Sequence, residues 1–280
     1  MKQALLITSP TNRYVKLARS LRERSGREKK GLYLIEGAHL LEEARQARVP
    51  LEGVLYSPAF YATPRGEELV AGFKAAGCCC LAVAGDLLAA VSTTVTPPGI
   101  VAIAPIPEQS LAALLAAAPP STPPLLMIAA AIQDPGNLGT IWRTALGAGA
   151  AGLVLTRGSV DPYNPKVVRA AMGATFNLPV VSGLEPAALA RELQVAGIKL
   201  VVAEVGAPLT FWQADLSGSL ALAVGSENHG PGAELLAAAA ARVGIPLAGP
   251  AESLNAAVAA ALLLYEALRQ RQQDGAGKPS

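Results

Sequence analysis

The alternation of short apolar runs with helix-like segments after residue 124 is the feature that most limits the possible folds. Apolar runs occupy residues 125–131, 152–156, 178–181, 198–203, 220–224 and 242–245. Helical patterns occupy residues 138–148, 164–172, 186–196, 231–240 and 253–271. Strands that alternate with helices form a mostly parallel sheet with helices on both faces, and such sheets bind ligands beyond the carboxyl ends of their strands. The sequence therefore predicts an α/β fold whose site lies in the loops that follow the strands.

A shorter alternation precedes this region. We expect strands at residues 32–35, 54–56, 78–83 and 100–104, with helices at 37–47, 67–76 and 87–91. Residues 105–124 contain six prolines and one Ala/Leu-rich patch, a composition typical of an interdomain linker that holds at most one short helix. The predicted division is a domain at residues 1–106, a Pro-rich linker at 107–124 and a domain at 125–280.

The basic side chains are concentrated at the start of the chain. Residues 1–30 carry nine Lys/Arg and two Asp/Glu, a balance of +7, and the other 250 residues carry 14 basic and 19 acidic side chains, a balance of −5. Within residues 13–30 an apolar stripe of Val15, Leu17, Ala18 and Leu21 predicts a helix whose other positions are basic. A basic segment on a mildly acidic body indicates a polyanionic partner, although a solvated basic helix has the same pattern.

Composition excludes several classes of protein. Hydrophobic residues make up 51% and charged residues 16% of the chain, which is typical of a globular protein and not of a disordered one. The three cysteines are adjacent, at Cys78, Cys79 and Cys80, and no second Cys/His cluster completes a metal site with them. No apolar run is long enough to span a membrane and no signal-peptide core follows Met1, so we expect a cytoplasmic protein without a metal.

Three loops rich in Gly and Asn follow three of the predicted strands. Residues 134–145 read Asp-Pro-Gly-Asn-Leu-Gly-Thr-Ile-Trp-Arg-Thr-Ala, residues 225–230 read Gly-Ser-Glu-Asn-His-Gly, and residues 245–255 read Ile-Pro-Leu-Ala-Gly-Pro-Ala-Glu-Ser-Leu-Asn. In this order and spacing the loops resemble the signature of the SpoU (TrmH) family of RNA ribose 2'-O-methyltransferases, which belong to the SPOUT class. More loosely, Ser-Pro-x-Asn-x-x-Val-Lys at residues 9–16 and Tyr-Leu-Ile-Glu-Gly at 33–37 resemble the substrate-binding domain of many SpoU enzymes.

The resemblance implies a fold and a function. The fold is α/β, with a C-terminal SPOUT methyltransferase domain tied into a deep trefoil knot and an N-terminal ribosomal-protein-like α/β substrate-binding domain. General rules argue against the knot, since threaded chains are rare, so it rests on the family alone. The implied function is methylation of a ribose 2'-hydroxyl in RNA with S-adenosyl-L-methionine. Ribosomal RNA is the first expected substrate and transfer RNA the second. The implied enzyme is a homodimer joined through the C-terminal domain. The modified nucleotide cannot be read from the sequence.

Five residues are expected to carry catalysis: Asn137, Arg143, Glu227, Ser253 and Asn255. Asn137 also suits the N-cap of a helix that starts at residue 138, and Glu227 suits a surface turn. Either Ser253 or Asn255 could cap the last helix, and capping is the more ordinary role for Ser253. Arg143 lies in an apolar helix, where a buried guanidinium would need an acceptor. The resemblance assigns Arg143 to the 2'-hydroxyl or a nearby phosphate. A pKa above about 12 makes arginine a reluctant base, which favours phosphate clamping, but direct proton abstraction stays open.

The resemblance places the cofactor on the backbone of Gly225, Ile245 and Leu254. Glycine lets the backbone approach a ligand, and apolar pockets with backbone donors suit the edge of a nucleobase. In the last helix, small and apolar residues at helical spacing predict a close helix–helix contact consistent with a dimer: Ala256, Ala260, Leu263, Leu264 and Ala267.

Two other functions compete with methyl transfer. Gly147, Gly149 and Gly152 fit the Gly-x-Gly-x-x-Gly pattern of dinucleotide-binding oxidoreductases, but they follow a predicted helix and precede a strand. The dinucleotide fingerprint must follow a strand and open a helix, so we interpret this match as fortuitous. The second alternative is a non-catalytic RNA-binding or ribosome-assembly factor on the same fold, which only the intact loops argue against.

Overall fold

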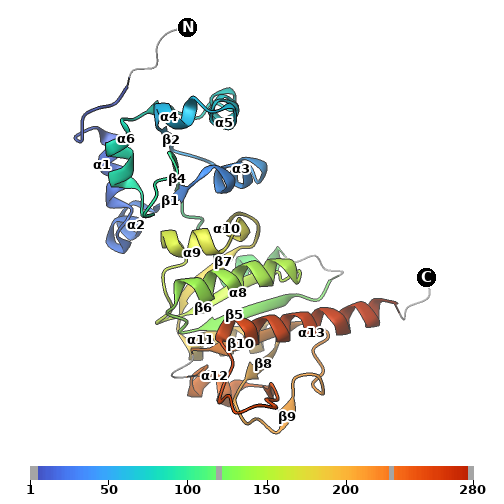
Figure 1. Cartoon of the computed structure of the whole chain (residues 1–280). Helices are drawn as coiled ribbons and strands as arrows, with labels where there is room; N and C mark the ends of the chain where they lie inside the picture. The colour runs from blue at the N-terminus through green and yellow to red at the C-terminus, as the bar shows by residue number, and fades with distance from the viewer. Residues whose placement is uncertain (1–5, 118–121, 227–229, 277–280) are drawn as a thin grey trace. The chain divides into compact units, whose positions relative to one another are not determined.

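The computed structural model of the chain describes residues 6–117, 122–226 and 230–276. The described residues form two compact units (Figure 1). The first unit contains the residues up to Glu108 together with Tyr163–Phe176, and the second contains Gln109–Pro162 and the residues from Asn177 onward. The two units are described separately below.

The first unit is built on a four-stranded mixed sheet. Its strands lie in the order β1 (Leu32–Glu36), β4 (Ile100–Pro105), β2 (Gly53–Tyr56) and β3 (Cys80–Ala82). Strand β4 pairs antiparallel with both β1 and β2, and β2 pairs parallel with β3. Helices α1 and α6 contribute to the core on one face, and α3 and α5 contact the sheet on the other (Figure 1). The helices of this region are α1 (Arg13–Ser20), α2 (Arg24–Lys30), α3 (Ala38–Gln46), α4 (Pro58–Tyr61), α5 (Pro64–Ala75) and α6 (Gly85–Val91).

The basic segment forms two helices, α1 and α2, and the predicted apolar stripe lies on the first and on the turn that follows it. Val15, Ala18 and Leu21 of the predicted stripe are fully buried against α6 and the sheet. The chain turns after α1, and α2 returns so closely that a Cβ at Gly26 would lie 1.9 Å from the carbonyl oxygen of Ser20. Only glycine fits this corner without a backbone shift.

Residues 163–176 belong to the first unit although they are far from it in sequence. Helix α9 (Pro165–Ala170) packs on β1, and the rings of Tyr33 and Tyr163 lie 4.8 Å apart. The carboxylate of Glu36, 1% exposed, accepts hydrogen bonds from the hydroxyls of Ser92 (2.9 Å) and Thr93 (2.6 Å). Arg169 lies 3.8 Å from that carboxylate and donates to the Thr93 hydroxyl at 2.7 Å. These partners satisfy a carboxylate that would be costly to bury alone.

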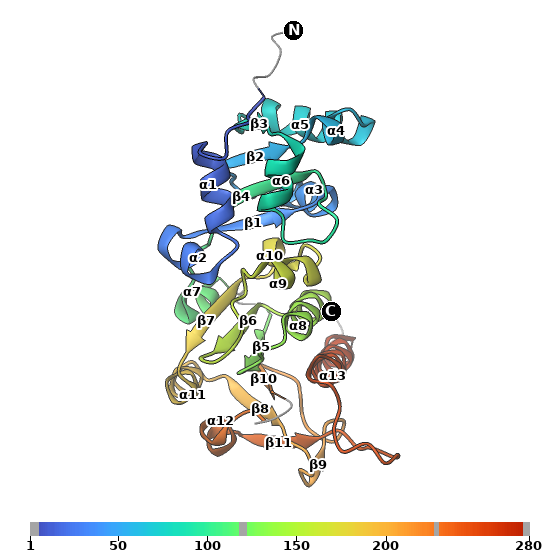
Figure 2. The ribbon, with the colours of Figure 1, turned by 60° about the vertical axis from the view of Figure 1, so that its left-hand side comes forward.

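The second unit is built on a seven-stranded sheet in which every pairing is parallel. The order is β7 (Val180–Leu184), β6 (Gly152–Thr156), β5 (Leu125–Ala130), β10 (Leu220–Gly225), β8 (Lys199–Ala203), β11 (Ala241–Gly244) and β9 (Leu209–Thr210). Helices α8 (Pro135–Gly147) and α13 (Ala256–Ala276) lie side by side on one face, and α11 (Pro186–Val195) and α12 (Ala233–Ala238) cover the other (Figure 2). The predicted parallel sheet with helices on both faces is confirmed.

Part of the Pro-rich segment is packed into the second unit. Helix α7 (Leu111–Ala116) buries Leu111 and Leu114 in the core shared by α11 and α12. A Cβ at Gly152, the first residue of β6, would lie 2.2 Å from Leu114, so this glycine makes room for α7. Gly152 therefore has a packing role. Since Gly147 ends α8 and Gly152 opens β6, the glycine pattern stands after a helix, as the sequence indicated.

The close helix–helix contact predicted for the small residues of α13 is made with α8 of the same chain. Leu263 and Leu264, like Ala260, are fully buried between α13, α8 and β10. The helix exposes a different face, with Val258 48% and Tyr265 52% exposed. Three short elements were not predicted: α4, β9 and α10 (Ala174–Asn177).

Candidate active site

The three Gly- and Asn-rich loops start from the same edge of the seven-stranded sheet. In the parallel ladders Gly225 pairs with Ala130 and Val243 pairs with Ala203, so β5, β10, β8 and β11 end together. Ser226 extends this arrangement, because its N–H donates to the carbonyl of Ala130 at 3.1 Å. The loops after β5, β10 and β11 therefore leave the sheet as neighbours, as expected for ligand-binding loops in an α/β fold.

The first loop begins with a strained residue. Ala131 has φ of 52°, a left-handed conformation that alanine rarely adopts. Its N–H donates to the hydroxyl of Thr156 at 2.9 Å, and Val160 N–H donates to the carbonyl of Ile132 at 2.8 Å. Such strain persists only where the surrounding structure holds it, and it concentrates at functional sites.

Asn137 is not the N-cap of α8, which excludes the alternative role that the sequence left open for it. The cap is Asp134, whose carboxylate accepts from the N–H of Asn137 at 2.7 Å, and Pro135 occupies the first turn. Proline suits this position because its missing N–H has no partner in the helix. The helix therefore starts three residues earlier than expected, and Asn137 lies in its first turn with its side chain available for another contact.

That contact is with Asn255, which joins the first loop to the third. The Nδ2 of Asn255 donates to the Oδ1 of Asn137 at 2.9 Å, across 118 residues of sequence. The Oδ1 of Asn255 accepts from the N–H groups of Ala257 (2.9 Å) and Val258 (3.4 Å), so Asn255 caps α13. Of the two residues that the sequence offered for this cap, Ser253 and Asn255, the structure uses Asn255.

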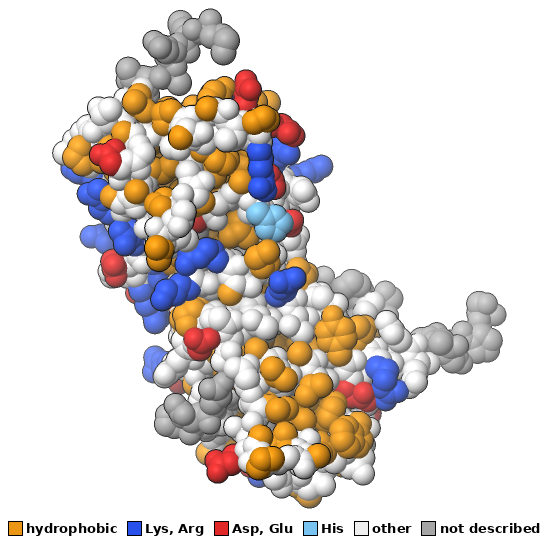
Figure 3. Space-filling model, viewed as in Figure 1, with side chains coloured by type: hydrophobic (Ala, Val, Ile, Leu, Met, Phe, Trp, Pro, Cys, Tyr) orange, Lys and Arg blue, Asp and Glu red, His pale blue; other side chains and the backbone are white. Residues whose placement is uncertain are grey.

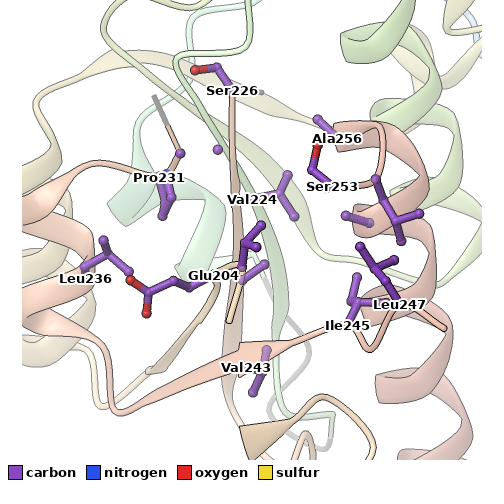
Figure 4. A pocket seen from close by; sticks show the side chains of 16 residues that line it. Glu204, Val224, Ser226, Pro231, Leu236, Val243, Ile245, Leu247, Ser253 and Ala256 are labelled. Atoms are coloured by element: carbon purple, nitrogen blue, oxygen red, sulfur yellow. The ribbon is translucent and has the colours of Figure 1, made fainter. Parts of the chain in front are cut away.

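A cavity of about 370 Å³ opens among the second loop, the third loop and the ends of β8 and β11. Its walls include Gly225, Ile245, Ser253 and Leu254, so all three residues predicted for the cofactor line one cavity with one of the catalytic candidates (Figure 4). The volume lies within the range of small-molecule sites, and the walls are mainly apolar.

Gly225 is required by the loop itself. A Cβ at this position would lie 1.8 Å from the carbonyl carbon of Gly230 and 2.1 Å from the nitrogen of Pro231. Gly230 N–H donates to the carbonyl of Ser226 at 2.8 Å and closes the loop. The sequence led us to expect that Gly225 lets the backbone approach a ligand. In the structure, Gly225 also lets two parts of the same loop approach each other.

Arg143 lies on the surface of α8, so the expectation that it is buried and needs an internal acceptor is wrong. Its position shares a helix face with Thr140, three residues earlier, which borders the exposed apolar face of α13. Trp142, beside it in sequence, is fully buried and donates its indole N–H to the carbonyl of Leu178 at 3.0 Å. The exposed guanidinium is therefore available to a partner that arrives from solvent. Glu227, the remaining catalytic candidate, lies outside the described residues.

Comparison with known proteins identifies the family. Residues 124–265 match the SpoU rRNA Methylase family, and residues 12–102 match the MRM3-like substrate binding domain. The chain belongs to the SpoU rRNA methylase family.

Relatives of this SpoU chain match almost its whole length. The 23S rRNA (guanosine(2553)-2'-O)-methyltransferase RlmP of Bacillus subtilis is 37% identical over 95% of the chain and 98% of its own length. A crystal structure of an RNA 2'-O ribose methyltransferase superposes with a TM-score of 0.78 at 36% identity, covering 96% of this chain and all of the other. The SpoU methyltransferase AviRb of Streptomyces viridochromogenes, in complex with the cofactor AdoMet, superposes with a TM-score of 0.83 at 29% identity, covering 95% and 100%.

Two further structural findings concern metals and membranes. Within the described parts of this SpoU chain, no three His, Cys, Asp or Glu side chains converge as metal ligands. None of the described helices combines the length and the apolar character needed to cross a bilayer.

Sequence reasoning missed Glu204, which also lines the cavity. Its only signal in the sequence is a single acidic residue directly after the apolar run 198–203, and many surface turns share that pattern.

The bond between Asn137 and Asn255 predicts energetic coupling. Asn255→Ala should lower the free energy of unfolding by about 1–2 kcal/mol, because it removes the α13 cap together with the bond. Asn137→Ala should cost less, and the double variant should cost about 0.5–1 kcal/mol less than the sum of the two. Urea unfolding checks this, with Ser253→Ala as the control that leaves stability within about 0.5 kcal/mol. Additive effects would show that the two side chains do not interact.

Proposed function

We propose that this SpoU protein transfers a methyl group from S-adenosyl-L-methionine to a ribose 2'-hydroxyl of ribosomal RNA, with transfer RNA as the second choice of substrate. The observation that carries the proposal is the convergence of the three loops: Asn137 is bonded to Asn255, and Gly225, Ile245 and Leu254 line one cavity beside them. The names of relatives that match nearly the full chain support ribosomal RNA, because RlmP is a 23S rRNA 2'-O-methyltransferase.

The cavity fits the cofactor. S-adenosylmethionine needs an apolar slot for its adenine, backbone groups for the edge of the base and polar groups for its ribose and amino acid. The apolar side chains of Ile245 and Leu254 supply the slot, and the backbone of these residues and of Gly225 supplies donors and acceptors. When bound, the cofactor supplies an activated methyl group, so no metal is required.

The polar residues around the cavity orient the reacting ribose. Asn137 and Asn255 hold the first turns of α8 and α13 together, and Ser253 lines the cavity two residues before Asn255. Arg143 contacts a phosphate beside the reacting nucleotide and stabilises the alkoxide that forms as the hydroxyl loses its proton. Glu227, which lies outside the described residues, keeps its place in the proposed catalytic set.

The two matched regions have different roles in this proposal, one in RNA binding and one in methyl transfer. Residues 1–106 form the RNA substrate-binding domain, of ribosomal-protein-like α/β type, residues 107–124 form the linker, and residues 125–280 form the methyltransferase domain. The segment after β10 is threaded as a deep trefoil knot of the SPOUT type, which the return of α13 to pack on α8 and β10 supports. A crystal structure in which the segment after β10 is not threaded would contradict the knot. We expect this enzyme to act in the cytoplasm, with its RNA.

The enzyme forms a homodimer through the exposed face of α13. Val258, Leu262 and Tyr265 on this face are 38–52% exposed and surround a shallow depression that Phe211 and Thr140 complete. Figure 3 shows hydrophobic side chains gathered over α13. A contiguous exposed apolar patch marks an interaction surface, and burial of this one in a dimer places Arg143 beside the interface.

The dimer predicts a change of mass on a single substitution. The wild-type protein should sediment at twice the chain mass of 28.5 kDa, and Tyr265→Glu should shift it to the monomer because a charge is buried without a partner. Val195→Glu is the matched control, since Val195 is an exposed apolar residue at the end of α11. A monomeric wild type, or a dimeric Tyr265→Glu variant, would contradict this interface.

The basic segment should bind RNA and not the cofactor. Arg19, Arg24, Lys29 and Lys30 are exposed on α1 and α2, where Figure 3 shows Lys and Arg gathered. Arg27 is 2% exposed and donates to backbone carbonyls of the preceding turn, so it is structural and is left in place. Replacing the other four by Gln should reduce the slope of log affinity against log salt by about 3, because up to four phosphate contacts are lost.

Titration of RNA affinity at several salt concentrations checks this slope, and titration with S-adenosylmethionine on the same variant serves as the control. The cofactor affinity should not change. An unchanged salt slope would show that this segment is not the main phosphate contact.

Arg143 provides the catalytic test. Arg143→Ala should lower single-turnover methyl transfer by about 10²–10³ while leaving the free energy of unfolding within about 0.5 kcal/mol, because the side chain is exposed. Arg143→Lys keeps the charge but loses the bidentate fork, so it should recover little. The matched control is Arg191→Ala, another exposed arginine in the second unit, on α11. Near-normal turnover in Arg143→Ala would remove this residue from the catalytic set.

A further inference from the structure

Glu204 is the one charged residue among the described residues that line the cavity. The other described lining residues are apolar, glycine or serine, and the serines are Ser226 and Ser253. A lone carboxylate in a mainly apolar site needs a partner to offset its desolvation. The cavity therefore holds a strong hydrogen-bond acceptor at one defined position.

The backbone holds Glu204 rigidly at the carboxyl end of β8. Its N–H donates to the carbonyl of Val243 at 3.0 Å, and its carbonyl accepts from Ala207 N–H at 3.3 Å. In Figure 4 the carboxylate points toward Leu236, on the side of the cavity away from Ile245. The side chain is 32% exposed, so a ligand in the cavity can reach it.

Within the protein, the carboxylate is only loosely paired. Arg242 lies 3.7 Å away and is itself 47% exposed, a distance that is too long for a hydrogen bond and a position that solvent screens. No hydrogen-bond donor among the described residues reaches the carboxylate oxygens. Four lone-pair directions are thus available to a ligand with hydroxyl or ammonium donors.

The position of Glu204 relative to the adenine slot selects which part of the cofactor meets this carboxylate. β8 lies between β10 and β11, the strands that lead to Gly225 and Ile245. Ile245 and Leu254 line the slot assigned to the adenine, and the carboxylate of Glu204 points to the side of the cavity away from Ile245 (Figure 4). It is therefore placed for the moiety attached to the adenine, and in S-adenosylmethionine that moiety is the ribose. Dinucleotide-binding α/β folds use an acidic side chain near a strand end in the same way, to accept from ribose hydroxyls.

Catalysis argues against the sulfonium as the partner. The positive charge on sulfur disappears as the methyl group leaves, so a carboxylate beside it would stabilise the ground state more than the transition state and slow the transfer. The ribose hydroxyls do not change charge, and a carboxylate that binds them contributes affinity without that penalty.

We propose that Glu204 binds the vicinal ribose hydroxyls of the cofactor, which donate hydrogen bonds to its carboxylate. The proposal rests on the proposed function, since it assumes that this cavity holds S-adenosylmethionine. It adds a cofactor-binding residue that the three loops do not contain and makes the site selective for ligands with both hydroxyls.

Calorimetric titration of the full-length protein tests the proposal. Glu204→Gln keeps the shape of the side chain and removes its charge, and it should weaken S-adenosylmethionine and S-adenosylhomocysteine by a similar factor of about 10–100, the strength of hydrogen bonds to a charged group. Arg242→Gln is the matched control and should leave both affinities within about threefold, because the ion pair it removes is screened. Thermal unfolding without ligand checks that both variants are folded.

The 2'-deoxy and 3'-deoxy analogues of S-adenosylhomocysteine isolate the contact. Wild type should bind at least one of them about 10–100-fold more weakly than the parent, and Glu204→Gln should show little of that difference. If the variant does not fold, undiminished binding of both analogues by wild type still overturns the proposal, and a loss supports it.

The other outcomes overturn the proposal in different ways. Wild-type affinity in Glu204→Gln excludes any cofactor contact. A loss confined to S-adenosylmethionine, with S-adenosylhomocysteine unchanged, places the carboxylate at the sulfonium. An equal loss from Arg242→Gln assigns the effect to the ion pair. Wild type without affinity for either cofactor form would overturn the proposed function itself, which the failure of the ribose contact alone would not.

Discussion

The common end of four parallel strands is the constraint on which the site depends. β5, β10, β8 and β11 pair in a register that brings Ala130 beside Gly225 and Ala203 beside Val243. Loops about 100 residues apart in sequence therefore start as neighbours. The bond between Asn137 and Asn255 then ties together the first turns of α8 and α13, the two helices on one face of the sheet. The parallel register thus starts the loops that carry these two asparagines as neighbours.

The site separates apolar binding from polar chemistry. The cavity walls are mainly apolar, with Glu204 as the charged exception among the described residues, while the amides of Asn137 and Asn255 lie at the start of the two helices. Arg143 stands apart on the surface of α8. A guanidinium that must bind the backbone of a large polyanion is best left exposed, because a buried one would already be neutralised by an acceptor inside the protein.

Local pattern predicted most of the strands and helices of both units, and the loops that converge. It failed where the outcome depends on competition between similar residues or on contacts between distant ones. Asp134 and Asn137 both suit an N-cap, and the structure uses Asp134, with Pro135 in the first turn. The spacing of small residues on α13 is the same for a dimer contact as for packing on α8. Glu36 and Arg169 are brought together across 133 residues, which no local pattern reports.

Methyl transfer to ribosomal RNA in vitro tests the central claim most directly. The purified protein is incubated with S-adenosylmethionine labelled in its methyl group and with ribosomal RNA from a host strain that lacks this gene. Digestion to nucleosides should recover the label in a 2'-O-methylated nucleoside, and mapping should place it at one position that is methylated in the parent strain and unmethylated in the deletion strain. Recovery of the label on a base, or no transfer to any RNA by a folded protein that binds the cofactor, would contradict the proposed reaction.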